Sequence, residues 1–321
     1  MNELTRIELL NDALKHISAP SPTTDTSLPN AYIIGCPRSG TTALLQWLAS
    51  TKIWDFPTNL MARFSSSPYI GLLVQQMLQD MGAIGNLTDI SFESEYGRSK
   101  KTLDTNEFFH FFRRYLHIND IAHLTESQLY NASVTEMFKK LKEPSQLTSK
   151  PFLTKALMLQ YNLPFFAPYC PTDLFLYIKR DPEFTMQSIY QARQNEFGSI
   201  HTWWSAKPAE YDWLKNKTPI EQIAGQVFFT EKAIEAGLEV INPKHYLVIN
   251  YTELVQQPML VLNRIIEKYS QLGVILRAGD VEQSVLISAD TRKIDNEILS
   301  ALLAAHDKFA HSETESHLKK I

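Results

Sequence analysis

The most informative segment of the sequence is Ala31-Tyr32-Ile33-Ile34-Gly35-Cys36-Pro37-Arg38-Ser39-Gly40-Thr41-Thr42. Its first four residues are apolar and typical of a buried strand, and the apolar residues that follow Thr42 recur with helical periodicity up to Ala49. Residues 35–40, which begin and end with glycine, join the two parts. A strand, a short loop and a helix in this order indicate the opening βα unit of a parallel sheet.

The loop between this strand and helix is suited to a single tetrahedral anion. Glycines let the backbone approach a ligand, and the N–H groups at a helix start attract negative charge. A loop that binds nucleoside triphosphates reads G-x-x-x-x-G-K-[ST], but Thr41 stands where the lysine is expected. We expect an anion site made by Pro37, Arg38, Ser39, Gly40, Thr41 and Thr42, the alternative being a helix start that binds no ligand.

Two further apolar runs, at residues 174–178 and 246–250, are typical of buried parallel strands. Residues 55–150 between the first and second runs have mostly helical patterns. The sequence therefore predicts an α/β fold, a doubly wound parallel sheet of P-loop type with a largely helical insertion at about 55–150. Residues 1–29 are expected to form an N-terminal helix and linker, and residues 30–321 a single domain.

A second anion grip is indicated at the end of the run at 174–178. Arg180 follows that run directly, and Ser188 stands eight residues later in a helical pattern that starts near Pro182. Open α/β sheets bind ligands at the carboxyl ends of their strands. An arginine fork with a hydroxyl is a suitable pair of donors for a phosphate. The alternative is a surface pair of Arg180 with Asp181 in a turn.

These motifs resemble those of the sulfotransferase family that uses 3′-phosphoadenylyl sulfate. Residues 33–42 are similar to the family's loop for the 5′-phosphosulfate, and Arg180 and Ser188 have the spacing of its pair for the 3′-phosphate. Asn250-Tyr251-Thr252-Glu253-Leu254 is similar to the family's late Tyr-Glu-x-Leu junction. The resemblance covers roughly residues 30–275. It is nearer to carbohydrate and bacterial types than to the soluble aryl type, which has a lysine where this chain has Arg38.

The resemblance implies a sulfotransferase that moves a sulfuryl group from 3′-phosphoadenylyl sulfate to a hydroxyl and releases adenosine 3′,5′-bisphosphate, with no metal. It places Arg38 on the sulfuryl group and Lys155 near the transferring group. Arg292 and Lys293 match a late basic loop of the family by position and charge only, and an exposed basic turn is the alternative. A saccharide or glycoconjugate is the expected acceptor.

The resemblance does not identify the general base. The soluble branch has a histidine two residues after its lysine, and this chain has Leu157 there. We rank Glu107 and His110 first, because both lie in an aromatic-rich helical segment, where burial would raise the pKa of a glutamate. The open alternatives are a helix-capping box made by Asp104 and Glu107, and a core role for His110.

Three weaker candidates complete the expected site. His201, which precedes a pair of tryptophans, is a third candidate base. Trp204 or Trp203 is expected to stack on a sugar face, the alternative for both rings being core packing. His201 and Trp204 are therefore the expected acceptor-binding residues. Asp55 is a further candidate base.

Composition limits the other classes of protein. The 31 Lys and Arg residues against 35 Asp and Glu residues give a net charge of −4, which argues against a nucleic-acid partner. Two cysteines fit a reducing compartment, and no apolar run approaches the 18 residues of a membrane span. We expect a cytoplasmic protein whose oligomeric state is open. The alternative functions are a P-loop kinase or NTPase, or a nucleotide-binding protein without catalysis.

Overall fold

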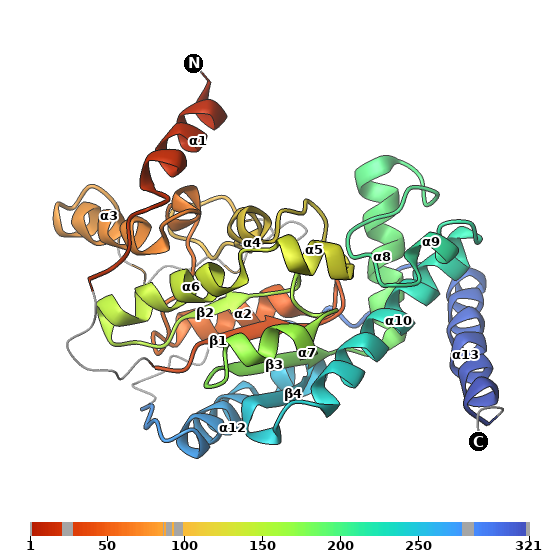
Figure 1. Ribbon diagram of the computed structural model, residues 1–321. Helices are drawn as coiled ribbons and strands as arrows, with labels where there is room; N and C mark the ends of the chain where they lie inside the picture. The colour runs from red at the N-terminus through yellow and green to blue at the C-terminus, as the bar shows by residue number, and fades with distance from the viewer. Residues whose placement is uncertain are drawn as a thin grey trace.

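The computed structural model describes residues 2–20, 28–85, 87, 92, 99–277 and 286–318 (Figure 1). Within these residues four strands form one parallel sheet with the order β2-β1-β3-β4. The strands are β1 (Ala31–Ile34), β2 (Leu153–Lys155), β3 (Leu174–Lys179) and β4 (Tyr246–Asn250). The chain leaves β1 for β2 on one side and returns to β3 on the other, so the strand order reverses between β1 and β3. Open sheets of this kind bind ligands at such a reversal point.

Helices cover both faces of the sheet, which confirms the doubly wound arrangement. Alternate side chains of a strand point to opposite faces. Tyr32 and Phe175 pack on α4 (Phe109–Leu116), α6 (Val134–Thr148) and α7 (Leu163–Phe166). Ile33 and Leu176 pack on the other face, against α2 (Thr41–Ser50) and α12 (Pro258–Gln271). Every residue of β1 is buried, as its wholly apolar sequence predicts.

Strand β2 was not predicted as a strand. It has only three residues, and two of them are Thr154 and Lys155. A strand this short and this polar gives no apolar run for sequence analysis to detect. It pairs with β1 at the edge of the sheet, where Ile33 lies beside Lys155. Lys155 is therefore carried to the same edge of the sheet as the loop after β1.

The insertion between β1 and β2 is largely helical, as predicted. It contains η1 (Met61–Phe64), α3 (Pro68–Asp80), α4, α5 (Glu126–Asn131) and α6. The N-terminal helix α1 (Glu3–Leu14) packs on this insertion through Asn11, which is fully buried. The Asn11 amide donates to the Arg63 carbonyl at 2.8 Å and accepts from the Ser66 N–H at 2.8 Å.

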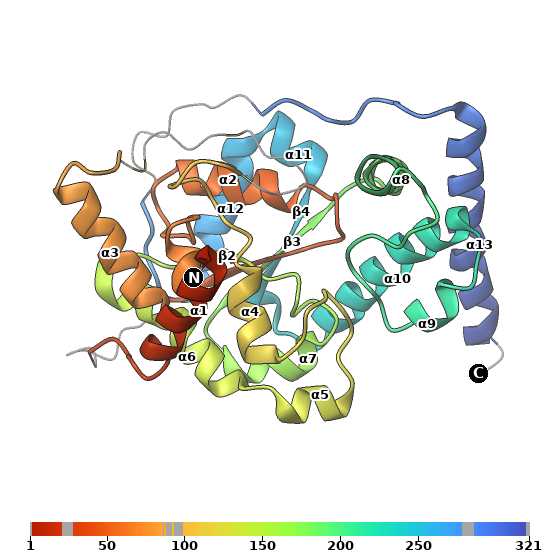
Figure 2. The same ribbon diagram turned by 90° about the horizontal axis from the view of Figure 1, so that it is seen from above.

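A further group of helices lies to one side of the sheet (Figures 1 and 2). It consists of α8 (Pro182–Phe197), α9 (Tyr211–Leu214), α10 (Pro219–Glu239) and α13 (Asn296–Leu318), which pack on one another. The remaining elements are η2 (Ala167–Tyr169), η3 (Pro243–His245) and α11 (Tyr251–Gln256). No helix in the described ranges combines the length and apolar character that a bilayer crossing requires.

Candidate active site

The two glycines of the loop after β1 are required by the packing around them. A Cβ atom on Gly35 would lie 2.7 Å from the carbonyl oxygen of Ile178 in β3. Gly40 has φ +100°, and its Cβ would lie 2.5 Å from the ring of Tyr251. Side chains at these positions would push the loop away from β3 and α11. The loop is therefore fitted tightly against the strand that carries the second motif.

The structure brings the two predicted anion-binding sites together. Arg38 has a left-handed backbone, with φ 71°, and its Nε donates to Ser188 Oγ at 2.9 Å. Arg180 Nη1 donates to the carbonyl oxygen of Arg38 at 2.9 Å. Ser39 Oγ is buried beside Gly35 and has no hydrogen-bond partner within the described structure. A buried hydroxyl without a partner fits a loop that receives a polar ligand.

Arg180 is held from several directions at the end of β3. Its Nε and Nη2 atoms both donate to Asp290 Oδ1, at 2.7 and 2.6 Å. The ring of Tyr251 lies against the guanidinium, with its centroid 4.7 Å from Cζ. Only 7 % of the Arg180 surface is exposed. A buried cation needs such partners, because the protein interior solvates charge poorly.

Lys155, Glu107 and Thr42 form a second polar group beside the loop. Lys155 Nζ pairs with the Glu107 carboxylate and donates to Thr42 Oγ1 at 3.1 Å. The Lys155 and Glu107 side chains are only 6 % and 16 % exposed. These residues come from the end of β2, the insertion and the start of α2. The arrangement places a carboxylate next to the predicted anion loop.

The predicted helix that was to carry both Glu107 and His110 starts later than expected. Phe108 has φ 59°, and α4 begins after it with no side-chain cap. The alternative of a capping box made by Asp104 and Glu107 is therefore wrong, and Asp104 Oδ2 instead accepts from the Lys101 N–H at 3.1 Å. The left-handed Phe108 breaks the helical register, so Glu107 turns to the sheet edge independently of the helix.

His110 lies on the face of α4 that is turned toward α1. Its neighbour Arg114 bonds Glu8 of α1 at 2.7 Å, and His110 does not line the cavity at the loop. Burial and the nearby Arg113 guanidinium lower the pKa of His110. Phe109 and Arg113, one helical turn apart, line the cavity instead.

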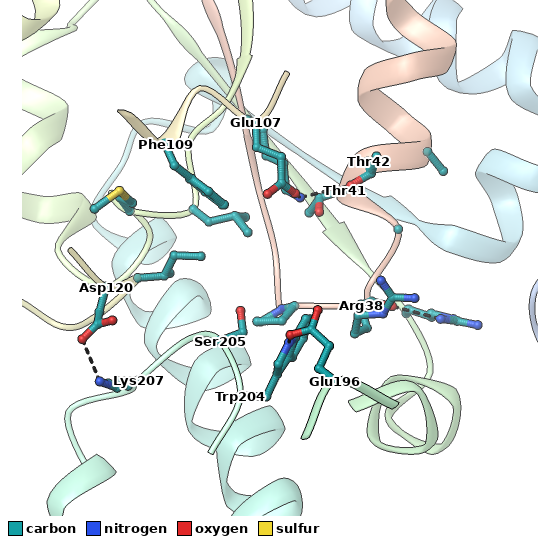
Figure 3. A pocket seen from close by; sticks show the side chains of 18 of the residues that line it. Arg38, Thr41, Thr42, Glu107, Phe109, Asp120, Glu196, Trp204, Ser205 and Lys207 are labelled. Atoms are coloured by element: carbon teal, nitrogen blue, oxygen red, sulfur yellow. Dashed lines mark hydrogen bonds and ion pairs between the residues drawn. The ribbon is translucent and has the colours of Figure 1, made fainter. Parts of the chain in front are cut away.

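A cavity of about 580 Å³ extends from the loop after β1 toward the end of α8 and residues 203–207 (Figure 3). Its described walls combine cations and hydroxyls at the loop with apolar, aromatic and polar side chains farther away. The loop end includes Arg38, Thr41, Thr42, Lys155 and Arg180. The other lining residues include Phe109, Asp120, Ile121, Leu157, Met158, Glu196, Trp203, Trp204, Ser205 and Lys207. A concave site with a few placed polar groups is typical of small-molecule binding.

Several other lining residues could not be recognised as site residues from the sequence. Glu196 lies near the end of α8 and accepts from Trp204 Nε1 at 2.8 Å. Lys207 pairs with Asp120 at 2.7 Å, although the two residues belong to different segments of the chain. Nothing in their local sequence separates them from ordinary surface charges.

Besides Ser39, His110 and Ser188, four predicted residues do not line this cavity. His201 is exposed and does not line it. Arg292 is exposed and pairs with Glu183 at 2.8 Å, and the neighbouring Lys293 is also exposed. Asp55 is buried against Thr148, and burial raises its pKa. None of the four lies among the described residues that line the cavity.

The tryptophan wall of the cavity is held from behind by Arg193 of α8. Arg193 is completely buried, and its guanidinium lies against the Trp203 ring at 5.1 Å. It donates to the Ile200 carbonyl at 3.2 Å and to the side-chain oxygens of Gln222 and Gln226 at 2.9 and 3.4 Å. Burial lowers the pKa of Arg193 to about 10, so the side chain stays charged at neutral pH.

The same network fixes the backbone of the wall. Gln226 Nε2 donates to the carbonyl oxygens of Trp204 and Ala206, at 2.8 and 2.7 Å. Trp203 Nε1 also donates to Ala206, at 3.2 Å. Ser205 takes a left-handed conformation, with φ 64°. The positions of Trp203 and Trp204 are thus set by buried glutamine amides of α10 and by Arg193.

The chain forms an α/β domain built on a parallel four-stranded sheet, and comparisons with known proteins identify its family. The family model described as "Sulfotransferase family" matches residues 29–271. This chain belongs to the sulfotransferase family. No curated protein matches it. No group of three or more His, Cys, Asp or Glu side chains that could hold a metal ion occurs in the described part of the chain.

Solved structures similar to the chain include bacterial sulfotransferases. STF1 from Mycobacterium tuberculosis H37Rv has a TM-score of 0.51 and 15 % identity, covering 94 % of this chain and 79 % of that chain. STF9 from Mycobacterium avium has a TM-score of 0.47 and 13 % identity, covering 89 % and 69 %. The sulfotransferase domain of the Synechococcus PCC 7002 olefin synthase has a TM-score of 0.42 and 15 % identity, covering 92 % and 98 %. The likeness to STF1 concerns the fold.

Replacing Arg193 with methionine tests the support of the tryptophan wall. The Ile200 carbonyl and the oxygens of Gln222 and Gln226 would lose a buried donor, at a cost of about 1–3 kcal/mol for each group left without a partner. We expect the free energy of unfolding to fall by about 3 kcal/mol, measured by urea denaturation. Arg292→Met, which removes an exposed arginine, is the matched control and should leave stability unchanged. Equal stability of the two variants would contradict this role for Arg193.

Proposed function

We propose that the chain transfers the sulfuryl group of 3′-phosphoadenylyl sulfate to a hydroxyl of an acceptor. The observation that supports this proposal most directly is that the loop after β1 and Arg180 line the same cavity. The loop lacks the lysine that holds a triphosphate, and a second cation lies beside it at the end of β3. Two separate anion grips suit a donor with one anionic group at its 5′ end and a phosphate at its 3′ position. Membership of the sulfotransferase family supports the sulfuryl-transfer chemistry.

Within this proposal the two anion-binding sites bind different groups of the donor. The backbone of residues 35–40, the hydroxyls of Thr41 and Thr42, and Arg38 bind the 5′-phosphosulfate. Arg180 and Ser188 bind the 3′-phosphate. The Ser188 hydroxyl accepts from Arg38 with its oxygen, so its own proton is free to donate to a phosphate.

Glu107 is the general base that we propose. It lines the cavity next to the loop, whereas His110, His201 and Asp55 do not. As the acceptor oxygen bonds to sulfur, the sulfur–oxygen bond to the donor's phosphate breaks, and Glu107 takes the hydroxyl proton. Lys155 and Arg38 offset the negative charge that develops on the leaving phosphate. Lys155 is suited to this task, because it bonds both the proposed base and the first turn of α2.

The acceptor that we propose is a saccharide or glycoconjugate. Trp203 and Trp204 supply aromatic surfaces of the kind on which sugar rings stack, and Ser205, Asp120 and Lys207 supply hydroxyl, carboxylate and ammonium groups nearby. Screening of saccharides against phenols and peptides tests this choice. Transfer to phenols alone would contradict it.

Binding of the product nucleotide tests the donor. We expect adenosine 3′,5′-bisphosphate to raise the melting temperature of the folded protein, with a larger shift than ATP and magnesium give. A larger shift with ATP and magnesium would favour a kinase or NTPase. Bisphosphate binding without turnover across a broad set of hydroxyl acceptors would favour a nucleotide-binding protein without catalysis.

Substitution of the two arginines should separate transfer from donor binding. Arg38→Ala should nearly abolish transfer, because this guanidinium offsets charge on the reacting group. Arg180→Ala should mainly raise the dissociation constant of the bisphosphate, since it removes the grip on the 3′-phosphate. Calorimetry and turnover with an acceptor found in the screen measure the two effects. Equal and mild losses in both variants would show that these roles are wrongly assigned.

Substitution of the proposed base should reduce turnover without weakening nucleotide binding. Glu107→Gln removes the proton acceptor, and general-base catalysis contributes roughly 10²–10⁴-fold to rate. We expect kcat to fall within that range while the affinity for the bisphosphate changes by less than about twofold. Glu136→Gln, at a half-exposed carboxylate of α6, is the control and should turn over normally. Normal turnover by Glu107→Gln would assign the proton to another group.

A further inference from the structure

The edge of Arg180 that an incoming phosphate would use is already occupied by a carboxylate of this chain. Asp290 Oδ1 accepts from both Nε and Nη2, while Nη1 donates to the Arg38 carbonyl. Tyr251 lies over the guanidinium. Arginine binds a carboxylate or a phosphate through the same pair of N–H groups.

Geometry and charge make Asp290 and a bound phosphate compete for Arg180. Arg180 lines the cavity at the loop, so a phosphate bound there is within its reach. It can form two parallel hydrogen bonds with the Nε–Nη2 edge only if Asp290 leaves that edge. Two anions on one edge of a guanidinium would repel each other strongly in a site as buried as this one.

The segment that carries Asp290 is attached to the body mainly by polar contacts. The Ala289 N–H donates to the Tyr251 hydroxyl at 3.2 Å. Gln187 of α8 donates to the Thr291 carbonyl at 2.8 Å and accepts from the Lys293 N–H at 2.6 Å. Residues 287–289 and 291–293 are exposed, so little apolar surface holds them in place. Segments of this kind separate from the body at a lower free-energy cost than core elements do.

We propose that Asp290 is an internal counter-ion that the 3′-phosphate of the nucleotide displaces from Arg180. It compensates the buried guanidinium when the site holds no nucleotide. It lowers the affinity for donor and product by competing for the same edge, and it favours release of the bisphosphate after transfer. This inference rests on the proposed function, because it requires a ligand with a phosphate near Arg180.

Calorimetry with adenosine 3′,5′-bisphosphate tests the competition. Asp290→Asn removes the charge and keeps the size of the side chain, so we expect the bisphosphate to bind about tenfold more tightly, which corresponds to about 1.4 kcal/mol. Adenosine 5′-monophosphate has no 3′-phosphate, and its affinity should not change. Glu183→Gln is the matched control, because it frees Arg292 of the same segment without touching Arg180. The control should bind the bisphosphate like the unmodified chain.

The outcomes separate this inference from the proposed function. Weaker binding by Asp290→Asn would show that Asp290 orients Arg180 instead of competing for it, and unchanged binding would show no competition. Either result overturns the inference while the proposed function stands. An equal gain with Glu183→Gln would assign the effect to loosening of the segment and also overturn it. If the unmodified, folded protein binds no bisphosphate, the proposed function fails and the inference fails with it.

Hydrogen exchange on the unmodified chain provides a measurement that does not depend on the folding of a variant. The amides of Ala289 and Lys293 are hydrogen-bonded to Tyr251 and Gln187 in this structure. If the bisphosphate displaces Asp290, these amides should exchange faster when the nucleotide is bound. Unchanged or slower exchange at both amides would contradict displacement.

Discussion

The site depends on the parallel pairing of β1 with β3. Ile34 lies beside Tyr177 in the register of these strands, so both strands end at the same edge of the sheet. The loop after β1 and Arg180 after β3 therefore start as neighbours, although about 140 residues separate them in the sequence. The absence of a side chain on Gly35 lets the loop approach β3 closely. The place of the glycine-bounded loop, of the buried guanidinium and of the cavity that both line follows from this pairing.

The parts of the fold that the sequence predicted share a strong local pattern. Apolar runs identified β1, β3 and β4, and the glycines with the following periodicity identified the loop and α2. Two errors have local causes that patterns do not contain. Strand β2 is three residues long and two of them are polar, and the left-handed Phe108 separates Glu107 from the helix that was expected to include it. The same turn gives Glu107 its place beside Lys155.

Long-range pairing explains why the rest of the site was not predictable. Asp290 meets Arg180 across 110 positions, and Lys207 meets Asp120 across 87. Each of these charged residues looks like an ordinary surface residue in its own segment. The sequence predicted that Ser188 and Arg180 bind the same phosphate, but it did not predict the hydrogen bond between Ser188 and Arg38. The partners of these residues within the protein depend on tertiary packing, which no local sequence pattern contains.

The amide environment of Arg193 has a consequence for how the enzyme selects what it binds. The guanidinium contacts neutral groups: a backbone carbonyl, two glutamine side chains and an indole ring. None of these groups gains or loses a proton between mildly acidic and mildly alkaline solution. The support that Arg193 gives to Trp203 therefore keeps the same charge over that interval. If the acceptor stacks on Trp203, selectivity that arises from this ring should then be insensitive to acidity, even where the reaction rate is not.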